Sequence, residues 1–255
     1  MNRNNKREVI VVLALVIAAI LFAAALDLIK GRQTAESDVV YISAEELSII
    51  SSKGTDEPDN VRFKTEYESL NGITREDDDV YLAPVSVPED NPFKYSTEDE
   101  VLQLLNEKGT GCVYFGGSWC RYCRLVVPTL ADLAEEVNYI PAIYDNDYSE
   151  NESYQALAEQ VYEYVAKKDT AFANVTGTTK TIENYLSYCE SDGVYIQPST
   201  IIFINKGVIV GVNMGTVPDH KSTSEPLSEQ ELIELKETLT NHLEKLGTNP
   251  CPTKC

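Results

Sequence analysis

The sequence is poor in histidine and in basic residues. Among its 255 residues it has only two histidines, and 21 lysines and arginines stand against 41 aspartates and glutamates, which gives a formal net charge of −20. A charge of this sign repels the phosphate backbone, so we expect no nucleic-acid partner. The histidines, His220 and His242, match no catalytic arrangement, and the chain shows no internal repeat.

Cysteine is scarce as well. The chain has six cysteines, which are too few for a disulfide scaffold at this length. Two of them, Cys120 and Cys123, form a Cys-x-x-Cys motif. No second cysteine or histidine pair stands at the spacing of zinc ligands. The motif therefore favours a redox pair, with a zinc half-site and a purely structural disulfide as alternatives, and we expect no metal or organic cofactor.

The motif lies where a strand gives way to a helix. An apolar run at 112–115 predicts a buried strand, and apolar residues at helical spacing over 126–137 predict a helix after the motif. At a helix start, free N–H groups and the helix dipole stabilise a thiolate. We therefore expect Cys120 to attack a disulfide and Cys123 to resolve the intermediate, while Arg121 lowers the pKa of Cys120.

Two further features accompany the motif. Pro128 follows Cys123 by five residues, and Pro198 opens an apolar run that is followed by a glycine turn and a second apolar run. Together with Trp119 and the cysteines, this order resembles the thioredoxin superfamily. The resemblance implies a thioredoxin-like α/β fold, a cis proline at Pro198 facing the cysteines, and a substrate groove shaped by Trp119, Gln197 and Pro198.

The sequence departs from that family at two places. Thioredoxins carry a buried aspartate on the strand before the motif, and Tyr114 stands at the matching position here. An insertion at about 148–190 carries two apolar stripes, which predict two helices before the proline strand. The segments 63–72 and 87–93 look like the lead-in of thioredoxin-like proteins of Gram-positive bacteria, which are often grouped with bacteriocin-transport accessory proteins.

The N-terminus contains an unbroken apolar run, Val9 to Leu26. As a helix it would rise about 27 Å, close to the roughly 30 Å hydrocarbon core of a bilayer. We expect a cytoplasmic N-terminus at 1–8, a transmembrane anchor at 9–29 and an extracytoplasmic C-terminal domain; the alternative is a signal peptide that is cleaved to release a secreted protein. An acidic, extended linker is predicted at 30–62 and the thioredoxin-like domain at 63–247.

The remaining cysteines divide into two groups. Cys112 and Cys189 fall in apolar patterns and are expected to be buried thiols. Cys251 and Cys255 lie in the tail at 248–255, where we expect a structural disulfide; the alternative is that they shuttle electrons to or from Cys120.

Taken together, the patterns predict a membrane-anchored, extracytoplasmic thiol–disulfide oxidoreductase. Its partners would be the thiols and disulfides of other proteins and, in addition, a membrane redox partner. The rival hypothesis is a thioredoxin-fold binding module without enzymatic activity, in which the disulfide is structural. The direction of electron flow is open between oxidation, reduction and isomerisation.

Overall fold

The computed structural model describes residues 39–47, 56–142, 144, 151–167, 196–217, 220 and 225–247. The predicted anchor at 9–29, the second insertion helix, Cys189, and the tail cysteines Cys251 and Cys255 lie outside these residues. Within the described part of the chain, no helix is long and apolar enough to cross a membrane.

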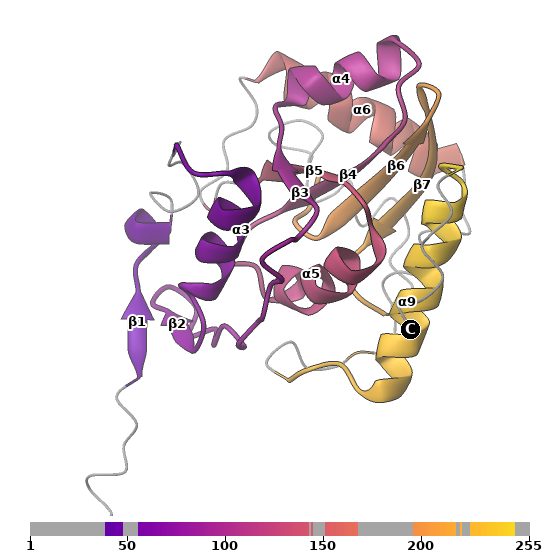
Figure 1. The fold of residues 1–255 in the computed structure, drawn as a ribbon. Helices are drawn as coiled ribbons and strands as arrows, with labels where there is room; N and C mark the ends of the chain where they lie inside the picture. Colours follow the sequence, from indigo (N-terminus) through magenta and orange to yellow (C-terminus); the bar gives the residue numbers. More distant parts are fainter. Residues whose placement is uncertain are drawn as a thin grey trace, which may run out of the picture. The chain divides into compact units, whose positions relative to one another are not determined.

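A five-stranded mixed sheet forms the centre of the fold (Figure 1). Its strands, in spatial order, are β3 (Phe93–Tyr95), β5 (Val137–Pro141), β4 (Gly111–Gly116), β6 (Thr200–Asn205) and β7 (Val208–Met214). The first three run parallel to one another, whereas β6 pairs antiparallel with β4 and with β7. The strand before the cysteine motif, β4, therefore has a neighbour on each side and is held in the middle of the sheet.

Helices cover both faces of this sheet (Figure 1). One face carries α3 (Asp59–Glu68), α5 (Arg121–Leu133) and α9 (Glu229–Glu244), and the other carries α4 (Glu98–Asn106) and α6 (Glu152–Lys167). Side chains of β4 alternate between the faces: Tyr114 packs toward α5, and Phe115 packs toward α6. This arrangement confirms the mixed α/β class and the buried strand at 112–115.

The helix starts follow the local sequence. Thr97 and Ser228 each close a capping box at the start of α4 and α9, in which the side chain accepts a hydrogen bond from the backbone three residues on. On α9, Leu235, Leu239 and Leu243 are buried as its periodicity predicts, but Leu232 of the same stripe is exposed.

The insertion and the predicted linker both contribute to the core. The first insertion stripe forms α6, whose Tyr154 and Leu157 are buried. In the predicted linker, β1 (Val40–Ile42) pairs with β2 (Ile73–Arg75), and Ile42 and Leu47 are buried in the same cluster as Phe63. The segment from Tyr41 onward thus belongs to the same compact unit as the domain predicted at 63–247.

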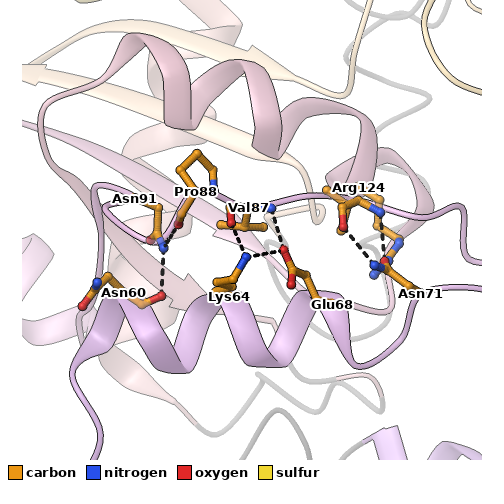
Figure 2. Close-up of polar contacts among 9 residues, drawn as sticks. Asn60, Lys64, Glu68, Asn71, Val87, Pro88, Asn91 and Arg124 are labelled. Carbon is orange, nitrogen blue, oxygen red and sulfur yellow. Dashed lines mark hydrogen bonds and ion pairs between the residues drawn. The ribbon is translucent and has the colours of Figure 1, made fainter.

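The segment after β2 is held against α3 by side chains rather than by a strand ladder (Figure 2). Lys64 donates to the Val87 carbonyl at 2.7 Å, and Glu68 accepts from the Val87 N–H at 2.9 Å. Asn91 donates to the carbonyls of Asn60 and Pro88, each at 2.8 Å. Between residues 80 and 87 the structure has only one isolated bridge, which joins Tyr81 to Thr74, and Pro84 lacks the N–H that a longer ladder would need.

The cis proline predicted at Pro198 is not found. No cis peptide bond occurs in the described residues, which include Gln197 and Pro198. One residue, Ser199, stands between Pro198 and β6, and it takes a left-handed conformation with φ 71°. The chain therefore turns into β6 at Ser199, so a cis bond is not needed for the bend.

Candidate functional site

The two cysteines of the motif lie at the start of α5. Cys120 is the N-cap residue, with extended backbone angles, and its Sγ accepts a hydrogen bond from the backbone N–H of Cys123 at 3.4 Å. Both are free thiols; Cys120 is 6% exposed and Cys123 is 0% exposed. The sequence-based placement of Cys120 at a helix start is therefore confirmed.

The surroundings drive the acidities of the two thiols apart. Burial opposes ionisation of Cys120, but hydrogen bonds from the Cys123 thiol and from the backbone of Cys123 and Tyr122, together with the charge of Arg75, lower its pKa overall. Burial raises the pKa of Cys123 well above its usual range, and the neighbouring Cys120 raises it further. The pair thus has one sulfur suited to attack as a thiolate and one that stays protonated at rest.

Arg75 was missed by the sequence analysis, because nothing in the pattern of β2 indicates that it reaches the motif. Its Nη1 donates to the carbonyl of Trp119 at 3.4 Å, and Asp78 forms an ion pair with its guanidinium. The guanidinium carbon lies 5.4 Å from the ring centroid of Tyr144, and the arginine is 8% exposed. A nearly buried cation is thus fixed beside the residue that precedes Cys120.

Arg121, the cation predicted to tune Cys120, lies on the first turn of α5. Its guanidinium carbon is 5.4 Å from the ring centroid of Tyr122, a side chain that is 39% exposed. The Arg121 guanidinium thus makes a cation–π contact with the Tyr122 ring. Its role in tuning Cys120 stays a prediction, whereas Arg75 contributes a charge that lowers the pKa of that thiol.

The two arginines can be separated by experiment. Arg75→Gln should raise the pKa of Cys120, because it removes a cation held in a site with little water. Alkylation of Cys120 at pH 7, followed by mass spectrometry of the labelled peptide, should slow by several-fold. Arg121→Gln is the matched variant, and a slowing as large as that of Arg75→Gln would show that Arg121 is an equal source of the effect.

Trp119 forms a wall beside the motif. Its indole N–H donates to the carbonyl of Ala142 at 3.2 Å, and its ring meets Tyr144 edge-on with centroids 5.0 Å apart. A Cβ on Gly117 would lie 2.5 Å from the indole nitrogen, so only glycine leaves room for this ring. Trp119 is 8% exposed, and its role in substrate binding stays a prediction.

The turn at 197–200 lies against the end of β4. The Ser199 N–H donates to the carbonyl of Phe115 at 2.9 Å, five residues before Cys120. Gln197 is exposed, and its carbonyl accepts a hydrogen bond from the Thr200 hydroxyl at 2.7 Å. The structure thus brings Gln197 and Pro198 to the strand end that leads into the motif, and a substrate groove there stays a prediction.

A buried carboxyl, Glu66, lies on the core side of α3. It is 5% exposed and accepts hydrogen bonds from the hydroxyls of Tyr95 and, at 3.2 Å, Tyr139. Burial raises its pKa to about 7, although both hydrogen bonds act in the opposite direction. The sequence alone could have indicated that Glu66 is buried, because it lies on the same helical face as Phe63 and Leu70.

This carboxyl predicts a pH dependence of stability. Since its pKa is raised from about 4.5 to about 7, the folded state holds the proton more tightly than the unfolded state. The contribution of Glu66 to the free energy of unfolding should therefore be largest below pH 4.5. About 3 kcal/mol of this free energy should be lost as the pH rises from 4.5 through 7. Urea unfolding of Glu66→Gln should lack this loss.

The control for that prediction lies on the same helix. Glu68 binds Lys64 and Val87, and its pKa is lowered despite an opposing effect of burial. Glu68→Gln should therefore keep the fall in stability between pH 4.5 and 7. An equal slope in wild type and Glu66→Gln would show that the carboxyl does not titrate in this range.

The third described cysteine is separate from the pair. Cys112 is a free thiol, 2% exposed, and burial raises its pKa strongly. Its predicted burial is confirmed.

The two histidines make structural contacts away from the cysteine pair. The His220 ring bonds Glu231 at 3.0 Å, and the His242 ring stacks on Phe203 with centroids 4.8 Å apart.

No protein-family model matches the chain, and no curated protein matches it. Function therefore has to be inferred from the residues around Cys120 and Cys123.

Proposed function

We propose that the protein is a thiol–disulfide oxidoreductase with a thioredoxin-like domain, anchored in the cell membrane with that domain outside the cytoplasm. Cys120 attacks a disulfide of a protein substrate, and Cys123 resolves the mixed disulfide. The observation that carries the proposal is the placement of the pair: Cys120 is the N-cap residue of α5 and its Sγ accepts the Cys123 N–H at 3.4 Å, whereas Cys123 is fully buried. This placement lowers the pKa of Cys120 and raises that of Cys123.

The fold assignment is supported by the strand order β3-β5-β4-β6-β7. A thioredoxin-like domain requires three parallel strands, then one strand antiparallel to them and a last strand antiparallel to that one, with the cysteine motif after the central strand. The α6 helix fits an insertion between β5 and β6. The membrane anchor at 9–29 and the location rest on the apolar run from Val9 to Leu26 and its flanking charges.

The environment of Cys120 also bears on the direction of electron flow. Interactions that stabilise its thiolate stabilise the reduced form of the pair, and a stabilised reduced form makes the disulfide more oxidising. We therefore propose that the disulfide is a better oxidant than one between unperturbed cysteines. The electrons would pass to a membrane redox partner, and no organic cofactor is needed for the exchange.

A second candidate is a binding module in which the disulfide is only structural. The low exposure of both sulfurs favours it, because a buried sulfur reacts slowly with protein substrates. Catalysed reduction of insulin by dithiothreitol separates the two functions. The full chain in detergent should accelerate the reaction, and Cys120→Ser should abolish the acceleration. Equal rates with wild type and Cys120→Ser would favour the binding module.

A further inference from the structure

Two tyrosine hydroxyls lie in the core behind the cysteine pair. Tyr114 on β4 and Tyr67 on α3 are both fully buried, and their hydroxyl oxygens are 3.1 Å apart. Burial raises the pKa of Cys123, and the Tyr114 hydroxyl acts in the opposite direction by hydrogen bonding that lowers it. A Cβ on Gly116 would lie 2.3 Å from this hydroxyl, so the glycine leaves the space that the phenol occupies. The two hydroxyls are called the hydroxyl pair below.

The direction of these hydrogen bonds follows from the number of protons. Each hydroxyl and each thiol has one proton to donate. The Cys123 backbone N–H donates to Sγ of Cys120 at 3.4 Å, and hydrogen bonding from the Cys123 thiol lowers the pKa of Cys120, which assigns the thiol proton of Cys123 to the bond toward Cys120. Tyr114 must then donate to the sulfur of Cys123, and Tyr67 must donate to the oxygen of Tyr114. Three successive donors thus point toward Cys120.

We propose that the hydroxyl pair of Tyr67 and Tyr114 stabilises negative charge on the redox sulfurs, first on Cys120 and then on Cys123. Hydrogen bonds in such a chain polarise one another, and their effect is strong where water is excluded. This inference rests on the proposed function, because it assigns two positioning residues to the same reaction.

The second part of the reaction is where Tyr114 acts most directly. In the mixed disulfide, Cys123 loses its proton and its sulfur attacks Sγ of Cys120. A Cys120–Cys123 bond forms, and the bond from Cys120 to the substrate breaks with its electron pair going to the substrate sulfur. That sulfur takes up a proton in place of the one that Cys123 gave up. Since burial disfavours the Cys123 thiolate, the O–H donor of Tyr114 should accelerate this step.

The titratable and charged groups around the pair come from five elements: Arg75 from β2, Tyr67 from α3, Tyr114 from β4, Arg124 from α5 and Tyr139 from β5. Tyr139 supplies a matched control. It is as buried as Tyr114 and stacks on it with centroids 5.6 Å apart, but its hydroxyl bonds Glu66 instead of a cysteine.

One assay measures both steps. In the full chain with Cys251 and Cys255 replaced by alanine, attack of Cys120 on 5,5′-dithiobis(2-nitrobenzoate) releases one coloured thiolate, and resolution by Cys123 releases a second. Tyr114→Phe should slow the second release by about tenfold, as expected for one lost hydrogen bond to an anion. It should slow the first release less. Tyr67→Phe should act in the same direction with a smaller effect.

The outcomes separate the hydroxyl pair from the proposed function. Tyr139→Phe should leave both releases unchanged, which excludes a general effect of removing a buried hydroxyl. Wild-type rates of the second release in both Tyr114→Phe and Tyr67→Phe would overturn the inference while leaving the function intact. If attack by Cys120 in the wild-type chain released no coloured thiolate from the reagent, the proposed function would fail, and the role of the hydroxyl pair would fail with it. Should Tyr114→Phe fold poorly, Tyr67→Phe decides the question alone.

Discussion

Cys123→Ala should accumulate covalent complexes with substrate proteins, and Cys120→Ala should accumulate none. Attack needs only the sulfur at the helix start, whose pKa is lowered, whereas release of the substrate needs the second sulfur. In the Cys123→Ala chain the mixed disulfide therefore has no internal thiol to resolve it. Non-reducing gels of cells that express each variant, followed by mass spectrometry of the trapped bands, would measure the difference.

The tail cysteines are the main confounding thiols in that experiment. Both variants should be made in a chain in which Cys251 and Cys255 are alanine, so that only Cys112, Cys189 and one cysteine of the motif remain. Complexes that form through Cys123 in the Cys120→Ala chain would reverse the assigned roles. Equal trapping by both variants would show that neither sulfur is the preferred nucleophile.

Arg124→Met should destabilise the folded domain by about 3–5 kcal/mol, since it removes one buried cation with several acceptors. Arg124 on α5 is 3% exposed. It donates to the carbonyls of Ala83 at 2.7 Å, and of Tyr67 and Ser118 at 2.9 Å. Its contact with Asn71 joins α5 to the segment that follows α3 (Figure 2). Methionine would keep the packing of the stem but leave these acceptors unpaired.

Arg121→Met is the matched control for this change. Arg121 lies on the first turn of the same helix but stacks only partly buried beside Tyr122, so its loss should cost less than about 0.5 kcal/mol. Urea unfolding monitored by circular dichroism gives both values. A loss for Arg124→Met no greater than that for Arg121→Met would contradict the role assigned to the buried guanidinium.

The parts of the site that the sequence predicted are those governed by local rules. An apolar run followed by a helical pattern placed Cys120 at a helix start, and an apolar stripe in the insertion predicted the helix α6. These positions depend on the periodicity of one element at a time. For the same reason the capping residues of α4 and α9 were predictable without any knowledge of the sheet.

The parts that the sequence did not predict depend on contacts between distant segments. Arg75 approaches Trp119 from 44 residues away, and Arg124 reaches Tyr67 from 57 residues away. No periodicity of β2 or α5 shows which segment will cover a polar side chain. The bend at Ser199 is a different case, because the pattern around Pro198 does not show that the next residue takes a left-handed conformation.

The central claim is that Cys120 and Cys123 form a reversible redox pair, and its reduction potential tests this most directly. The full chain would be equilibrated with glutathione buffers of different potential. Mass spectrometry of the peptide that contains Cys120 and Cys123 would then give the fraction in which the two are linked by a disulfide. We predict one two-electron transition between about −270 and −120 mV, nearer the oxidising end. A disulfide that never forms, or one that stays unreduced below about −300 mV, would contradict the account.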